Sequence, residues 1–288
     1  MADAGPRHLV SYFGNRYLDH LHRDLAEIRD HGFDGVVHCV TEADHEWGMA
    51  RVAEMFAMTR DAGLSCWADP WGVARVFGGE AHSGYLARGG TVGARDAGLL
   101  ALLHNWTDEV AAAGAEWILW DEPDLGLGHD SDALVSFLAD VTSHARERGL
   151  RNSVCLTSAM PNLPVFPRLA ALESVDDIGT DPYYKLEVDE RDPDPDDYVG
   201  VWAQRVRDVA GEHGKTSHVW VQAFHIAGGR EDRIARCVGV ARARGVTRLG
   251  VWGFRACEAL DIRPARPEVA WKVVRDALAA AGDAIRGD

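Results

Sequence analysis

Short apolar runs that alternate with longer amphipathic segments constrain the fold of this chain more than any other feature. The runs with strand character occupy residues 9–13, 35–40, 64–70, 116–124, 152–157, 178–184, 217–224 and 249–254. Helix-like segments follow them at about 18–31, 48–62, 97–113, 130–148, 166–172, 198–213, 231–244 and 267–285. This alternation predicts parallel strands joined by helical crossovers.

Eight such units in 288 residues predict an α/β protein with a (β/α)8 TIM barrel, and the composition shows no break, so we expect one domain over 1–288. The runner-up is a doubly wound sheet. That fold usually carries a glycine-rich phosphate loop after an early strand, and the sequence contains no such motif. The connection around 70–98 is long and glycine-rich, and connections of that length are usually functional.

The composition disfavours several classes of binding partner and cofactor. The net charge of −15 disfavours nucleic acid and anionic membranes, which reward clustered Lys and Arg. The five cysteines are scattered without a C-x-x-C pair, which indicates buried free thiols and neither zinc nor disulfides. We expect no cofactor and no metal. The N-terminus lacks the pattern of a signal peptide, and no run approaches the ~20 apolar residues of a membrane span. We expect a soluble, cytoplasmic protein, and the sequence does not predict its oligomeric state.

The fourth apolar run ends abruptly in acids. Residues 117–120 read Trp-Ile-Leu-Trp, and Asp121, Glu122 and Pro123 follow. Proline stops a strand because it cannot donate to the sheet. The acids could simply favour the positive end of a following helix. In a barrel, however, active sites lie at the carboxyl ends of the strands, which places Glu122 at the mouth.

The other expected strands also end in polar and aromatic residues. With Glu122, we assign Asp121 and Asp181 to catalysis. The candidates for substrate binding are Tyr12, Asn15, Asp69, Trp71, Arg75, Glu80, Tyr183, Gln222, His225, Trp252, Arg255 and Glu258. Aromatic rings stack on sugar rings, carboxylates bind hydroxyls, and two carboxyl groups flanking a bond are the machinery of glycoside hydrolysis. No paired histidines at metal-ligand spacing and no G-x-S-x-G elbow occur.

The Trp-Asp-Glu-Pro ending makes the chain resemble the TIM-barrel glycoside hydrolases. In the clan that includes cellulases and β-galactosidases, the fourth strand ends in Asn-Glu-Pro and its Glu is the general acid/base. The resemblance implies that role for Glu122. The run from Val251 to Phe254 also looks like that clan, where a Trp floors the sugar site; Trp252 stands there.

The seventh expected strand departs from the pattern of this clan. The clan's nucleophile is a Glu ending the seventh strand, and this chain has Gln222. Another carboxylate could serve, or the enzyme could invert with a carboxylate as base for water. The candidates are Asp181, Glu258, Glu80 and Asp69. Alternatively, the substrate could supply its own nucleophile, since adjacent Asp121 and Glu122 also resemble the N-acetylhexosaminidases that use the substrate's acetamido group.

The predicted function is cleavage of a glycosidic bond in a small oligosaccharide or glycoside. Two alternatives belong to other classes. The first is a metal-dependent sugar isomerase or epimerase with Glu122, Asp181, His225 and Glu258 as ligands. The second is a non-catalytic sugar-binding barrel, suggested by Gln222. The tryptophans on helix-like patterns are expected in the core: Trp47, Trp106, Trp202 and Trp271.

Overall fold

A computed structural model describes residues 5–13, 18–70, 97–124, 131–158, 160–184 and 194–283. Its strands close into one barrel in sequence order, and each pairs in parallel with its neighbours, which confirms the (β/α)8 prediction. The strands are β1 (His8–Tyr12), β2 (Gly35–Cys39), β3 (Ser65–Asp69), β4 (Trp117–Asp121), β5 (Arg151–Thr157), β6 (Asp177–Asp181), β7 (Thr216–Gln222) and β8 (Arg248–Trp252).

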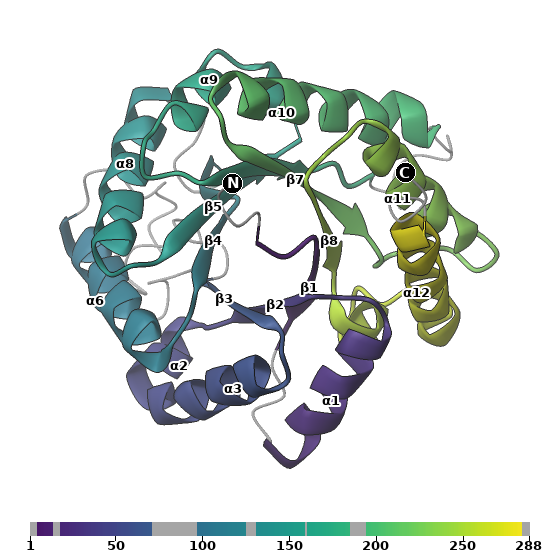
Figure 1. The fold of residues 1–288 in the computed structure, drawn as a ribbon, viewed down its shortest axis with the longest axis horizontal. Coiled ribbons are helices and arrows are strands. Elements are labelled where there is room, and N and C mark those ends of the chain that lie inside the picture. The colour runs from purple at the N-terminus through teal and green to yellow at the C-terminus, as the bar shows by residue number, and fades with distance from the viewer. Residues whose placement is uncertain are drawn as a thin grey trace.

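The helices form a ring outside the strands, as Figure 1 shows in a view along the barrel. They are α1 (Leu18–Asp30), α2 (Glu42–Trp47), α3 (Met49–Asp61), α6 (Ala97–Ala113), α8 (Ser131–Glu147), α9 (Val165–Ala170), α10 (Val201–Glu212), α11 (Asp232–Ala243) and α12 (Pro267–Asp283). Short helical turns are η1 (Met160–Asn162), η2 (Asp196–Gly200) and η3 (Phe254–Cys257). The long connection expected around 70–98 falls mostly outside the described residues.

Two hydrophobic layers result from the two-residue period of the strands. One side of each strand faces the helices, where it packs into the larger clusters under the helical ring. The other side fills the barrel. Its interior cluster consists of Leu9, Val37, Trp67, Trp117, Leu119, Cys155, Trp220, Trp252 and Cys257. All five cysteines are buried free thiols, as predicted.

Large rings fit inside the barrel because glycines face them. A Cβ at Gly250 would lie 2.3 Å from the Trp220 ring, and one at Gly179 would lie 2.3 Å from His218. Both distances are shorter than real Cβ contacts, so only glycine leaves room for these rings at the two positions. The interior is therefore a packed core up to the level of the mouth.

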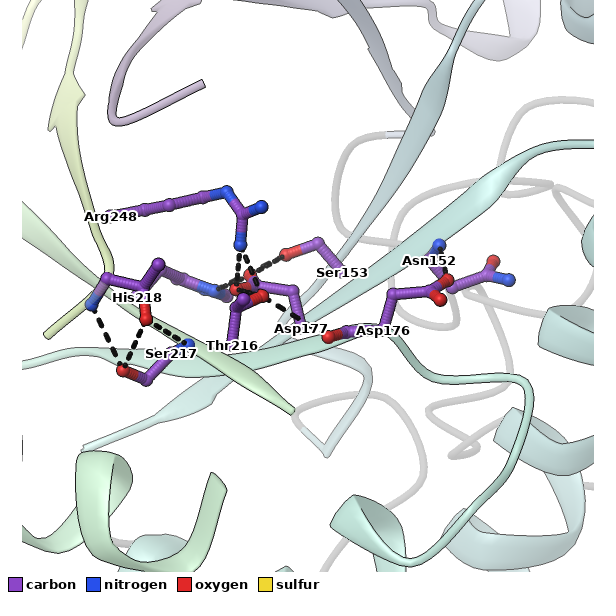
Figure 2. Close-up of polar contacts among 9 residues, drawn as sticks. Asn152, Ser153, Asp176, Asp177, Thr216, Ser217, His218 and Arg248 are labelled. Carbon is purple, nitrogen blue, oxygen red and sulfur yellow. Dashed lines mark hydrogen bonds and ion pairs between the residues drawn. The ribbon is translucent and has the colours of Figure 1, made fainter. Parts of the chain in front are cut away.

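A buried ionic network closes the amino-terminal end of the barrel (Figure 2). Asp177 accepts hydrogen bonds from Arg248 Nη1 at 2.5 Å, His218 Nδ1 at 2.5 Å, Thr216 Oγ1 at 2.6 Å and Ser153 Oγ at 2.7 Å. Burial by itself would raise the pKa of Asp177, but the charges and hydrogen bonds of Arg248 and His218 outweigh it and hold that pKa far below its usual range. The network fixes four strands at the floor, at the end opposite the expected mouth.

One helix differs from expectation. Residues 42–47 form α2 ahead of the expected helix, and the capping box of Thr41 and Asp44 starts it. Trp47 ends this six-residue helix with 82% of its surface exposed, so the prediction that it belongs to the core is wrong. Glu42, at the start of this short helix, is its buried residue, whereas Trp47 lies at the opposite end. Trp106 and Trp271 are buried as predicted.

Candidate active site

Carboxylates gather at the carboxyl ends of the strands β3, β4 and β6. Asp121 pairs in register with Cys155, and Asp181 with Thr157, so β5 lies between the two acids. Asp124, just beyond β4, is buried and accepts a 2.5 Å hydrogen bond from Thr157 Oγ1. Asp121, Asp124 and Asp181 therefore lie at the carboxyl end of the barrel, around β5.

Glu122 acts on the buried carboxyl of Asp181, since its charge and a side-chain hydrogen bond add to the effect of burial in raising the pKa of Asp181. The backbone of Glu122 is strained. It adopts a left-handed conformation with φ 43°, while its N–H still donates to the Cys155 carbonyl at 2.9 Å. Such a conformation costs a non-glycine residue about 1–3 kcal/mol, and strain of this kind concentrates at functional sites.

The mouth retains protons that isolated carboxyls would lose. Loss of solvation and the neighbouring Glu122 raise the pKa of Asp181 well above its usual range. Loss of solvation and the charges of Asp69 and Glu122 do the same to the pKa of Asp121. Burial, followed by the charge of Asp181, also raises the pKa of Tyr183. A pair of carboxyls that shares one proton supplies an acid and a base together.

Gln222 has hydrogen-bond partners at both ends of its amide. Its Oε1 accepts the Tyr184 N–H at 2.9 Å, and its Nε2 donates to the Phe224 carbonyl at 2.9 Å. It thereby joins the segments that follow β6 and β7. Tyr183 lies in the first of these segments and packs its ring against Phe224, with centroids 4.9 Å apart.

Trp252 faces the barrel interior at the top of β8. Its ring contacts Phe13 at a centroid distance of 4.6 Å and Trp220 at 5.8 Å, both edge to face. Asp69 ends β3 in a buried position. His225, which follows β7, has a left-handed backbone with φ 49°, and its N–H donates to the Ile262 carbonyl at 2.8 Å.

The remaining described candidates surround a separate cavity beside β1 and β8, which Tyr12, Arg255 and Glu258 help to line. Tyr12 points from β1 into the helical layer, where its hydroxyl donates to Asp24 at 2.7 Å. Arg255 pairs with Glu27 of α1 at 2.6 Å. The structure therefore divides the predicted site into a carboxylate group and a cavity group. Four candidates lie outside the described residues: Asn15, Trp71, Arg75 and Glu80.

Sequence reasoning missed three contributors to this face of the barrel. Thr157 orients Asp124, Cys155 hydrogen bonds to Asp121, and Phe13 extends the wall of Trp252. Their positions carried a signal, because every second residue of a barrel strand faces inward. Cys155 and Thr157 follow from that alternation once β5 is aligned.

Among the described residues, no group of three or more His, Cys, Asp and Glu side chains is arranged to hold a metal ion. Nor does any helix in the described ranges have the length and apolar character needed to cross a membrane.

No protein-family model and none of the curated proteins matches this chain. Solved structures share its fold. A GH5_18 protein from Streptomyces cattleya in complex with GlcNAc aligns with TM-score 0.69 and 14% identity, covering 96% of this chain and 80% of that one. An endo-1,4-β-mannanase from Rhizomucor miehei aligns with TM-score 0.69 and 8% identity, over 96% and 95%.

A third similar structure is the GH113 β-mannanase of Alicyclobacillus acidocaldarius, with TM-score 0.61, 14% identity and coverage of 96% and 97%. Identities this low show a shared TIM-barrel fold, the fold of these glycoside hydrolases. A fold alone does not determine the reaction, so the chemistry must be argued from the carboxylates themselves.

Proposed function

We propose that this protein is a glycoside hydrolase in which Glu122 is the general acid/base and Asp181 its partner carboxylate. One observation supports this most: Glu122 and Asp181 lie at the ends of β4 and β6, and the charge of Glu122 and a side-chain hydrogen bond with it act on the buried Asp181 carboxyl. Glycosidic cleavage needs one protonated and one ionised carboxyl on either side of the bond. A pair that shares a proton provides both.

The closeness of the pair favours a retaining mechanism. Inverting enzymes hold their carboxyls about 6.5–9.5 Å apart to admit a water molecule, whereas retaining pairs are about 5–5.5 Å apart. A hydrogen-bonded pair is closer than either class and must separate to admit the sugar, and the retaining distance requires the smaller separation. In the proposed first step, the proton of the pair lies on Glu122, which protonates the departing oxygen while the ionised Asp181 attacks the anomeric carbon. In the second, Glu122 takes a proton from water, which displaces Asp181 from the glycosyl ester.

Neighbouring groups adjust this pair. Burial and the charges of Asp69 and Glu122 raise the pKa of Asp121, which favours its uncharged form next to Glu122. Trp252 provides an aromatic surface at the top of β8. The substrate class is a small oligosaccharide or glycoside, in keeping with the carbohydrate ligands named for the similar structures.

The test is hydrolysis of a panel of 4-nitrophenyl glycosides by wild type, Glu122→Gln and Asp181→Asn. Both variants should lose about 10²–10⁴-fold in kcat/KM, the usual contribution of an acid/base group. The exposed Asp132→Asn is the matched control and should retain full activity. Full activity of Glu122→Gln on every substrate that wild type cleaves would contradict the assignment.

NMR identifies which anomer is released first, and this result distinguishes the remaining alternative mechanisms. Retention with loss of activity in Asp181→Asn supports Asp181 as nucleophile, and inversion would assign it as the base instead. Cleavage confined to N-acetylhexosaminides, lost in Asp121→Asn but kept in Asp181→Asn, would indicate the substrate's acetamido group. Activity that requires a divalent ion would favour the isomerase, and sugar binding without turnover would favour a non-catalytic barrel.

A further inference from the structure

A cavity of about 350 Å³ opens between the ends of β1 and β8 and the first turns of α1. We name it the β1–β8 cavity. Its lining includes Tyr12 and Phe13, Arg23 of α1, and the segment 254–260 that follows β8. The volume lies at the lower end of the range for small-molecule sites, which suits one sugar ring.

The wall of this cavity is continuous with the barrel interior. Phe13 lines the cavity, and its ring also contacts Trp252 at 4.6 Å. Cys257 lines the cavity and belongs to the interior cluster, and Leu260 lines the cavity and packs against that cluster. Phe13 and Cys257 therefore connect the lining of the cavity with the packing around Trp252.

The lining combines aromatic surface with charges of both signs. Phe13 and Phe254 provide apolar faces. The lining carries two arginines, Arg23 and Arg255, and two acids, Asp24 and Glu258, so its formal charges cancel. This balance offers no preference for an ionic ligand. Aromatic faces with hydrogen-bonding groups at their edges match an uncharged sugar.

The segment that forms the outer wall is held in a strained conformation. Arg255, Ala256 and Cys257 are all left-handed, with φ of 49°, 52° and 58°. Each such residue costs about 1–2 kcal/mol. The Glu27 carboxylate, which also accepts the Trp271 indole N–H at 2.8 Å, holds Arg255 in place. Strain of this kind persists only where the surrounding structure enforces it, and it marks binding sites.

We propose that the β1–β8 cavity binds a second, uncharged sugar ring of the substrate, joined to the ring that lies between Glu122 and Asp181. The inference rests on the proposed hydrolase function. It makes the preferred substrate at least a disaccharide, whose second ring extends over Trp252 and Phe13.

The experiment fills the cavity from its exposed edge. Ala259→Phe places a ring in the space, and Ala243→Phe, on the exposed end of α11, controls for an added surface aromatic. A second variant, Arg23→Ala, removes a polar group from the rim, and Arg29→Ala on the same helix is its exposed control. Substrates are 4-nitrophenyl glycosides of mannose, glucose and N-acetylglucosamine and of their β-1,4-linked disaccharides.

We expect Ala259→Phe to lower kcat/KM for the disaccharide glycosides about ten-fold or more, roughly 1.4 kcal/mol of transition-state binding. Arg23→Ala should lower it in the same direction. For monosaccharide glycosides, both variants should stay within about two-fold of wild type. Equal effects on both substrate lengths, or no effect on either, would overturn the subsite while leaving the hydrolase standing.

A binding measurement tests the proposed subsite independently of the proposed hydrolase activity. Tryptophan fluorescence of Glu122→Gln is titrated with the same disaccharides, with and without Ala259→Phe. If wild type cleaves no glycoside, but disaccharides bind and Ala259→Phe abolishes binding, the subsite stands and the hydrolase falls. Binding unchanged by Ala259→Phe, or no binding of any disaccharide, overturns the subsite.

Discussion

Replacing Asp177 by alanine should strongly destabilise the protein, because it would leave a buried guanidinium without its counter-ion. Asp177 and Arg248 have almost no exposed surface, and the aspartate accepts from the Arg248 guanidinium, the His218 ring and two hydroxyls (Figure 2). Removing one partner of a buried ion pair costs about 3–5 kcal/mol. For a chain of this size that lowers Tm by roughly 10 °C.

Urea unfolding followed by circular dichroism measures the loss. The control is Asp132→Ala, which breaks a 2.7 Å pair with Arg168 whose aspartate side chain is 84% exposed. It should cost less than about 1 kcal/mol. The double variant Asp177→Ala/Arg248→Met removes both charges and should be more stable than Asp177→Ala alone.

The same network has a defined pH dependence. Because its pKa is lower in the folded than in the unfolded protein, Asp177 contributes its full stabilisation above its unfolded pKa of about 4. That contribution declines as the pH falls further, so acid should destabilise wild type more than Asp177→Ala. A single variant within 1 kcal/mol of wild type, or a double variant showing simple additivity, would refute the proposed role of the network.

Three further results are expected. Asp181→Asn should raise Tm at neutral pH while removing activity. Because the pKa of Asp181 is raised in the folded protein, wild-type stability falls as the pH rises above about 4. The difference in Tm between variant and wild type should therefore grow from pH 4 to pH 7, and an unchanged difference would contradict this. Gln222→Glu should lose about 1–3 kcal/mol in urea unfolding without gaining activity, since a carboxylate cannot donate to the Phe224 carbonyl; faster hydrolysis would show that a carboxylate on β7 can serve. Gly250→Ala should cost about 1–3 kcal/mol in the same assay, because its Cβ overlaps the Trp220 ring, and wild-type stability would disprove that overlap.

The sequence by itself determined the fold and the face of the barrel at which the strand-end carboxylates lie. Apolar runs alternating with amphipathic segments permit few arrangements, and the carboxyl ends of parallel strands must meet at one face. Glu122 could therefore be placed at the mouth from its position after an apolar run ended by Pro123. The buried thiols were also predictable, because most of the cysteines lie in apolar stretches.

Only the tertiary structure decided which side chains meet. Strand periodicity does not give the registers and the left-handed turn that bring Glu122 onto Asp181. It also does not show that Gln222 binds two backbone groups or that Trp47 is exposed, because both depend on segments packed from elsewhere in the chain. Local patterns fix where a strand ends. The contacts beyond that end depend on the closure of the whole barrel, to which residues distant in sequence contribute.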